Sequence, residues 1–221
     1  VFTEQPTQQQ FVEMLWLPLM AGGTGEPGIF NRQGIIGRMP KRRQKLLTGA
    51  NKWIGVNPCG EIALRPFEFC NLSICVARPG DTEADLMQKV EIAAIYGTLQ
   101  STLTRFSYLR PEWRKNCEEE RLLGVDINGW QDCELLRYRA PERNVLMRKL
   151  RDHAVEVNRI WAERLGINQS AAVTCVKPSG NSSTAVRCRP GVHPAEASYF
   201  IRRVRSGRHD PLTKLLQDAG V

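Results

Sequence analysis

The chain has 221 residues, 42% of them hydrophobic and 24% charged, so it is long enough to bury a core and is not a disordered tail. Lys and Arg number 31 against 23 Asp and Glu, and the resulting charge of +8 indicates anionic partners without separating nucleotides, nucleic acid and acidic membranes. No run approaches the roughly 18 to 20 apolar residues that a membrane-spanning helix requires, and residues 1–10 lack the order of a signal peptide. We expect a soluble, cytoplasmic protein with no membrane partner.

The chain is of ordinary size and its cysteines are odd in number, seven, which fits reduced thiols better than a secreted disulfide framework. The chain begins with Val1 rather than Met, and the residues that lead to Val221 show no pattern typical of a C-terminus. No linker rich in Pro, Gly or Ser divides it. We therefore expect residues 1–221 to be an internal fragment of one larger domain.

The first third of the chain predicts one helix, a loop and a basic segment. Residues 7–20 are predicted to be helical, because Thr7 and Gln10 resemble a capping box. The glycines of residues 22–28 then predict a loop. Residues 38–45 are the densest basic run, and we interpret them as a solvated loop, with phosphate binding as the alternative.

The remaining elements alternate between helices and short strands. Helices are predicted at 82–105, opened by Thr82 with Asp85, and from Pro141 to a stop at Gly166. Short β-like runs lie at 70–77, 122–127, 171–176 and 199–204. This alternation favours an α/β fold with a largely parallel sheet.

The residues that carry most chemistry surround Cys59. Pro58 and Gly60 flank it with one stiff and one permissive residue, which suits the tip of a tight loop. If the loop is locally extended, the side chains of Asn57, Cys59 and Glu61 leave it in the same direction and converge on one small volume. For an isolated Pro-Cys-Gly the alternative is a turn with an inert buried cysteine.

The longer context resembles the ribonucleotide reductases, and in particular the class II enzymes that depend on adenosylcobalamin. The resemblance rests on ordered motifs over most of the chain: Gly25-Glu-Pro-Gly-Ile-Phe-Asn31, Asn57-Pro-Cys-Gly-Glu-Ile62 with Cys70-Asn-Leu72, and Asn116-Cys-Glu-Glu-Glu-Arg-Leu-Leu-Gly-Val125 with Gly129-Trp-Gln-Asp132. The later motifs resemble the monomeric, triphosphate-reducing branch: Val176-Lys-Pro-Ser-Gly180, and Gly191-Val-His-Pro194 with Tyr199-Phe-Ile-Arg-Arg-Val-Arg205.

The resemblance implies part of a ten-stranded α/β barrel with a central finger loop at Cys59. It implies adenosylcobalamin as the cofactor that makes Cys59 a thiyl radical, which takes the 3′-hydrogen of a ribonucleotide. Glu61 is then the general base on the 3′-hydroxyl, Asn57 hydrogen-bonds the substrate, and Cys70 is one half of a reducing pair that becomes a disulfide.

The resemblance also implies partners that close the catalytic cycle. In the family the redox partner of Cys70 is an upstream cysteine, and no cysteine precedes Cys59 here; the C-terminal cysteines that re-reduce the pair are missing too. We therefore expect the cycle to be completed by the full-length parent, with an external dithiol reductant such as thioredoxin and a deoxynucleotide effector.

A hydroxyl-rich segment after the third β-like run offers groups suited to phosphate. Backbone N–H groups, hydroxyls and a cation bind phosphate well where a helix begins, and the family uses the matching loop for substrate phosphates. Asn181 stands where the family usually has Thr, and an ordinary helix cap is the alternative interpretation. The predicted phosphate-binding residues are Lys177, Pro178, Ser179, Gly180, Asn181, Ser182 and Ser183.

The other cysteines show no C-x-x-C spacing, so a zinc site is not expected, and small buried thiols are the default for all of them: Cys75, Cys117, Cys133, Cys175 and Cys188.

Two alternative functions stay open. One is a non-catalytic basic module that binds nucleic acid or protein, although residues 38–45 lack interleaved aromatics. The other is the dimeric, diphosphate-reducing class II branch, which uses the same residues.

Overall fold

The computed structural model describes residues 5–23, 28–49, 53–137, 141–179, 181–192, 197, 199, 201 and 205–220. Its centre is a parallel pair of strands, β3 (Asn71–Val76) and β4 (Leu123–Asn128), in register from Asn71 opposite Leu123 to Val76 opposite Asn128. The β-rich runs at 70–77 and 122–127 therefore form the strands predicted for them. The parallel pairing confirms the expected sheet direction.

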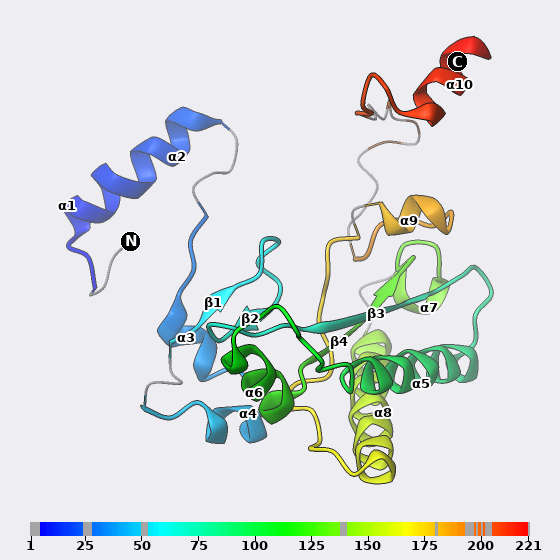
Figure 1. Cartoon of the computed structure of the whole chain (residues 1–221). Helices are drawn as coiled ribbons and strands as arrows, with labels where there is room; N and C mark the ends of the chain where they lie inside the picture. Colours follow the sequence, from blue (N-terminus) through cyan, green and yellow to red (C-terminus); the bar gives the residue numbers. More distant parts are fainter. Residues whose placement is uncertain are drawn as a thin grey trace.

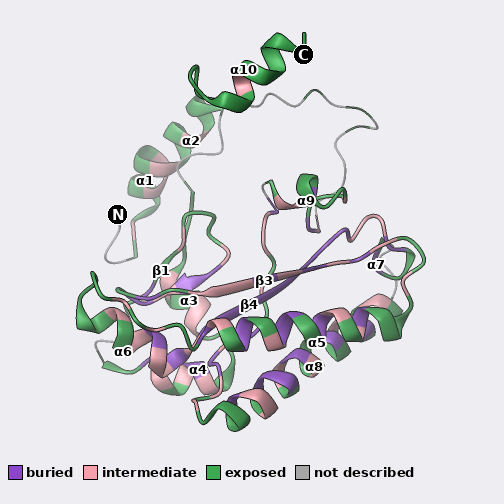
Figure 2. Ribbon diagram, turned by 45° about the vertical axis from the view of Figure 1, so that its right-hand side comes forward, coloured by how far each residue is buried: buried purple, intermediate pink, exposed green. Residues whose placement is uncertain are grey.

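Two long helices cover one face of this pair (Figures 1 and 2). Helix α5 (Glu83–Gln100) begins at a capping box of Thr82 and Asp85, as predicted, and ends five residues earlier than expected. Helix α8 runs from Pro141 to Leu165, and Gly166 follows it with φ +64°. Figure 2 shows the purple, buried sides of both helices turned toward the strands. The packed face includes Leu86, Val90, Leu146, Leu150 and Val157.

The third predicted strand, at 171–176, is reduced to a single parallel bridge between Val125 and Thr174. Backbone bonds still hold the segment beside β4: Leu123 N donates to Ala172 O at 3.0 Å, and Cys175 N donates to Val125 O at 3.1 Å. Among the described residues the sheets have two strands each, so the ten-stranded barrel stays a prediction. Most of the predicted strand at 199–204 lies outside the described residues.

The ends of the described chain project from this core (Figure 1). The predicted helix at 7–20 is present as α1 (Gln8–Phe11), a π-helical turn η1 (Val12–Trp16) and α2 (Leu17–Gly22), and its Thr7–Gln10 capping box is confirmed. Pro18, which has no N–H to donate, follows the widened turn. Helix α10 (Pro211–Asp218) lies at the opposite end of the chain, and neither end contributes a buried residue.

The interpretation of residues 38–45 as a solvated loop is wrong. Residues 41–46 form helix α4 (Lys41–Leu46), and the Arg43 side chain is 4% exposed. Its guanidinium forms ion pairs with two fully buried carboxylates, Glu68 at 3.5 Å and Glu120 at 2.9 Å. Burying a carboxylate without a partner is costly, and the buried Arg43 offsets that cost for Glu68 and Glu120.

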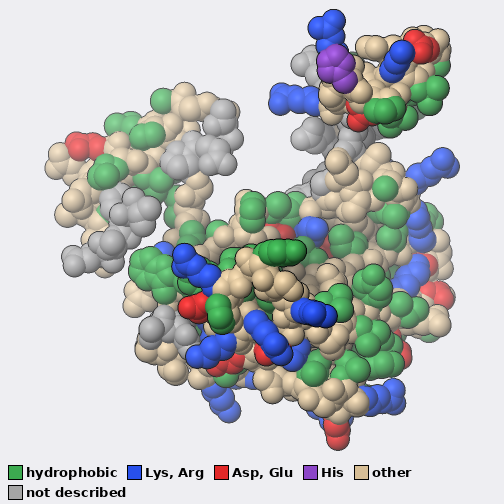
Figure 3. All heavy atoms as spheres, viewed as in Figure 1, with side chains coloured by type: hydrophobic (Ala, Val, Ile, Leu, Met, Phe, Trp, Pro, Cys, Tyr) green, Lys and Arg blue, Asp and Glu red, His purple; other side chains and the backbone are tan. Residues whose placement is uncertain are grey.

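The face of the molecule seen in Figure 3 has no single basic patch. Its Lys and Arg side chains are scattered, with Asp and Glu side chains between them. Three further short helices of the described fold are α3 (Arg32–Ile36), α6 (Pro111–Glu120) and α7 (Glu134–Arg137). No helix within the described ranges has the length and apolar character needed to cross a membrane.

Candidate active site

Cys59 lies at the tip of a short antiparallel hairpin. Strand β1 (Gly55–Val56) pairs with β2 (Ala63–Leu64), and residues 57–62 form the connecting loop. Asn57 closes this loop: its backbone N–H donates to Ile62 O, and its Oδ1 accepts from Ile62 N, both at 3.0 Å. Gly60 turns the chain with φ +80°, a conformation that strains other residues.

The hairpin exposes the Cys59 side chain, as predicted for a loop tip. The alternative of an inert buried cysteine is wrong for this residue. The loop is a tight turn rather than an extended segment, so the condition for Asn57, Cys59 and Glu61 to leave it in one direction is not met. The side-chain oxygen of Asn57 accepts the hydrogen bond from Ile62 N, so the role that the structure gives Asn57 is to hold the loop in its shape.

Glu61 carries a carboxylate with no protein partner. Both of its oxygens are buried, and neither has a hydrogen-bond partner among the described residues. Its charge is felt by three neighbours, because it helps to raise the pKa of Cys70, Asp126 and Cys175, although burial is the larger cause in each case. A buried carboxylate of this kind is a ready acceptor for a hydroxyl proton.

Cys70 immediately precedes β3, as predicted, and its thiol is half-buried. Burial raises the pKa of Cys70 to about 12. The charge of Arg43 opposes this shift, whereas Glu68 and Glu61 add to it and Lys177 opposes it. Cys70 and Glu61 therefore share one electrostatic environment. The described contacts include none that joins Cys59 directly to Cys70.

Two further residues in the electrostatic environment of Glu61 were not singled out from the sequence. Cys175, assigned only as a default buried thiol, is half-buried, and its pKa is raised by burial and by the neighbouring Asp126 and Cys70. Asp126 is a buried acid in β4; Lys177 N donates to its Oδ1 at 3.2 Å, while its Oδ2 is buried without a partner. A charged residue inside the apolar run Leu122–Ile127 was the available signal for this site.

The predicted phosphate segment lies beyond the bridged residue Thr174 and leads into a four-residue helix, α9 (Ser182–Ala185). Its hydroxyls are bonded within the segment: Ser182 Oγ donates to Ser179 O at 2.6 Å, and Ser179 Oγ donates to Ser183 Oγ at 2.8 Å. Asn128, at the carboxyl end of β4, donates to Ser182 Oγ at 3.3 Å. Gly180 lies outside the described residues.

A buried network of charged side chains lies next to strand β2 of the hairpin. Arg65, next to β2, has a side chain only 2% exposed, and it bonds Glu119 at 2.9 Å while lying 3.5 Å from Glu68 and 3.6 Å from Glu120. Burial, and then the charge of Glu120, raise the pKa of Glu68 to about 8 against the opposing effect of the arginines. With Arg43, these residues tie α4, β2 and α6 together.

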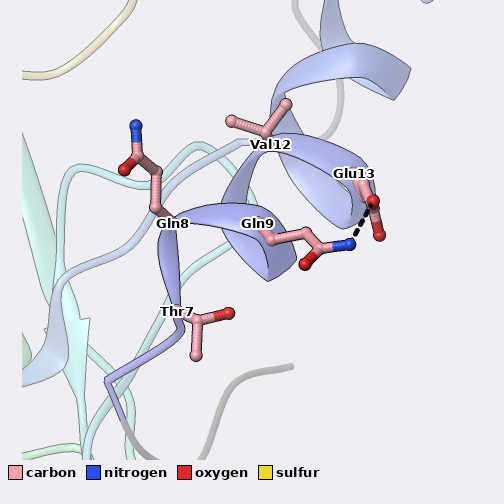
Figure 4. A pocket seen from close by; sticks show the side chains of 5 residues that line it. All are labelled: Thr7, Gln8, Gln9, Val12 and Glu13. Carbon is pink, nitrogen blue, oxygen red and sulfur yellow. Dashed lines mark hydrogen bonds between the residues drawn. The ribbon is translucent and has the colours of Figure 1, made fainter.

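The surface hollow beside α1 is not part of this site. It is lined by Thr7, Gln8, Gln9, Val12 and Glu13 (Figure 4). Gln9 Nε2 donates to Glu13 Oε1 at 2.9 Å across it. None of the residues predicted for chemistry lines this hollow. In the part of the chain that the structure describes, no three His, Cys, Asp or Glu side chains are grouped as metal ligands.

Comparison with known proteins supports the resemblance seen in the motifs. No family model matches the chain. The chain is 27% identical over 238 residues to the adenosylcobalamin-dependent ribonucleoside-triphosphate reductase of Lactobacillus delbrueckii subsp. bulgaricus, which covers 92% of this chain and 31% of that protein. It is 30% identical over 206 residues to the enzyme of the same name from Euglena gracilis, covering 89% of this chain and 26% of that protein.

A solved structure agrees with these relatives. The crystal structure of a B-12 dependent (class II) ribonucleotide reductase matches with a TM-score of 0.61 and 25% identity, covering 80% of this chain and 28% of that one. The resemblance predicted from the motifs is confirmed. The chain spans less than a third of the length of the curated relatives it matches.

Proposed function

We propose that this chain is a segment of an adenosylcobalamin-dependent ribonucleoside-triphosphate reductase, which converts ribonucleotides to deoxyribonucleotides for DNA synthesis. The observation that carries the proposal is the hairpin: it exposes the Cys59 thiol at its tip and keeps, two residues later, a buried Glu61 carboxylate with both oxygens unpartnered. A hydrogen-abstracting sulfur and a free base are the two groups that removal of a ribose hydroxyl requires.

The roles follow from the chemistry of each side chain. Cys59, as a thiyl radical, takes the 3′-hydrogen of the substrate. Glu61 then accepts the proton of the 3′-hydroxyl, which eases departure of the 2′-hydroxyl as water. Asn57 orients the substrate and keeps the loop in shape through its bond from Ile62 N. Cys70 supplies one of the reducing thiols.

The residues around Cys59 fit a cofactor that must reach the thiol from outside the protein. The Cys59 side chain is exposed, and a Cβ placed on Gly60 would meet no atom within 4 Å, so the hairpin tip has free space beside it. When bound, adenosylcobalamin supplies the radical that oxidises this thiol. Cys59 is the one residue we assign to contact with it.

Substrate phosphates are proposed to bind at 177–183. Because the hydroxyls of Ser179 and Ser182 are bonded within the loop, we assign them to shaping it. Phosphate charge is then met by Lys177 and by backbone N–H groups, at the carboxyl end of β4 where ligands of parallel sheets commonly bind.

The remaining assignments are proposed with the function. Residues 1–221 form a fragment of the catalytic barrel domain. The partners are the ribonucleotide, an external dithiol such as thioredoxin and a deoxynucleotide effector, with no membrane or nucleic acid, and the location is the cytoplasm. Burial of Arg43 removes one cation from the basic run that a nucleic-acid-binding module would present.

The test uses the full-length protein that carries this segment, supplied with adenosylcobalamin, a ribonucleoside triphosphate and a dithiol. Glu61→Gln keeps size and hydrogen bonding but removes the base, and we expect deoxynucleotide formation to fall by ~10²- to 10⁴-fold. Glu112→Gln, an exposed carboxylate on α6, is the matched control and keeps full activity. Equal rates for the two variants would end the assignment of Glu61 as base.

A further inference from the structure

An arginine at the end of β3 holds the chain that follows the proposed phosphate segment. Arg78 lies two residues beyond β3, and its guanidinium donates to Val186 O at 2.5 Å and to Arg187 O at 2.8 Å. These carbonyls belong to the C-cap residue of α9 and to the residue after it. The last carbonyls of a helix have no partner within the helix, and a cationic side chain binds them well.

Two side chains at the end of β4 hold the rest of this segment. Asn128 is the last residue of β4 and is fully buried; its Nδ2 donates to Ser182 Oγ at 3.3 Å, and its Oδ1 accepts from Gly191 N at 3.2 Å. Asp132 accepts from Arg189 N at 2.7 Å through its Oδ2. Together with the arginine, these side chains tie the segment to the sheet at its start, its middle and its end.

The backbone that carries Arg78 is itself fixed on both sides. Ala77 N donates to Asn128 O at 2.8 Å, which extends the bonding of β3 to β4 by one residue beyond β3. Arg78 N donates to Asp81 Oδ2 at 2.8 Å, and the same carboxylate pairs with Lys89 of α5. The guanidinium therefore reaches α9 from a backbone that the sheet and α5 hold in place.

We propose that Arg78 is a positioning residue for nucleotide binding. It holds residues 182–191 against the ends of β3 and β4, so that the adjoining phosphate segment is formed before substrate arrives. The inference rests on the proposed function, which places substrate phosphates at 177–183. A preformed site loses less entropy when its ligand binds, so Arg78 acts on substrate affinity. Turnover at saturating substrate depends on the groups that react and does not depend on this arginine.

The first arm of the test measures opening of the segment in the full-length protein by limited proteolysis. Trypsin cleaves after Arg187 but not after Lys177 or Arg189, because proline follows both of these residues. Cleavage after Arg187 requires the residues around it to unfold locally. Arg78→Met removes two hydrogen bonds from a charged donor, so we expect this cleavage to become roughly 10-fold faster or more.

Two further variants make the comparison specific. Proline follows Arg78 as well, so Arg78→Met neither adds nor removes a site for trypsin. Arg78→Lys keeps a cation that can bind the helix carbonyls, and it should restore much of the protection. Arg110→Met is the matched control: Arg110 is exposed, lies over the Phe67 ring and also precedes a proline, and its loss should leave cleavage after Arg187 unchanged.

The second arm measures deoxynucleotide formation by the same variants, supplied with adenosylcobalamin, a dithiol and increasing ribonucleoside triphosphate. We expect Arg78→Met to raise KM roughly 10-fold and to leave kcat unchanged, and Arg78→Lys to bring KM back toward the wild-type value. The triphosphate should also slow cleavage after Arg187 in the wild type. A lower kcat with unchanged KM, or a higher KM without faster cleavage, would overturn the proposal.

The outcomes separate this proposal from the proposed function. Faster cleavage of Arg78→Met with a normal KM refutes the positioning role and leaves the function standing. A wild type that forms no deoxynucleotide refutes the function, and binding of inorganic triphosphate then decides on Arg78. Weaker binding by Arg78→Met than by the wild type and Arg110→Met, together with faster cleavage, supports the positioning role. Equal binding by all three proteins overturns it.

Discussion

Replacing Arg43 by Met removes the cation that lies between two buried carboxylates. Its guanidinium bonds Glu120 at 2.9 Å and lies 3.5 Å from Glu68, and both carboxylate side chains are fully buried. Breaking a buried ion pair costs about 3–5 kcal/mol. Arg65 still lies 3.5 Å from Glu68 and 3.6 Å from Glu120, so we expect the lower end, about 3 kcal/mol.

For a chain of this size that loss corresponds to a decrease of roughly 6–12 °C in Tm. The assay is thermal and urea unfolding of the 221-residue chain followed by circular dichroism. Arg38→Met is the matched control, because Arg38 lies in the same basic run and is exposed; its stability should stay within about 0.5 kcal/mol of the wild type. A similar small change for Arg43→Met would refute the network's role.

The remaining predictions concern the packing at Gly124, the titration of Glu68 and the reducing role of Cys70. Gly124→Ala places a methyl group 2.4 Å from Leu72 Cδ2 and should cost about 1–3 kcal/mol, whereas Gly207→Ala, which meets no atom within 4 Å, should cost far less; equal unfolding midpoints would contradict the close packing. Because the pKa of Glu68 rises from 4.5 to about 8 on folding, the native state keeps a proton that the unfolded state loses in this window. Stability should therefore fall as pH rises from about 4.5 to 8, by up to roughly 1.4 kcal/mol per pH unit, and Glu68→Gln should flatten that decline. In the full-length protein, Cys70→Ser should leave hydrogen abstraction intact but block reduction, so free base should be released from labelled substrate in place of deoxynucleotide.

The helices and two of the strands could be predicted because their signals are local. Thr82 with Asp85 begins α5, and Pro141 and Gly166 bound α8. The exposed position of Cys59 followed equally from its two neighbours, Pro58 and Gly60. Such caps and turns act over three or four residues, so a single sequence carries them in full.

The features that were missed depend on residues distant in the chain. Arg43 is buried because Glu120, 77 positions later, bonds it. Cys175 approaches Cys70 because β4 lies between their segments and presents Gly124 to both. Nothing in the local pattern of either residue indicates its partner. The predicted convergence of Asn57, Cys59 and Glu61 depended on an extended loop, and that condition is not met because Gly60 makes a turn.

The central claim is that Cys59 carries the radical chemistry, and one measurement tests it most directly. The full-length protein and its Cys59→Ala variant are compared for deoxynucleotide formation and for nucleotide binding, with Cys188→Ala as a control for loss of a thiol away from the hairpin. We expect Cys59→Ala to form no deoxynucleotide while it binds nucleotide as the wild type does, and Cys188→Ala to remain active. Normal deoxynucleotide formation by Cys59→Ala would contradict the account.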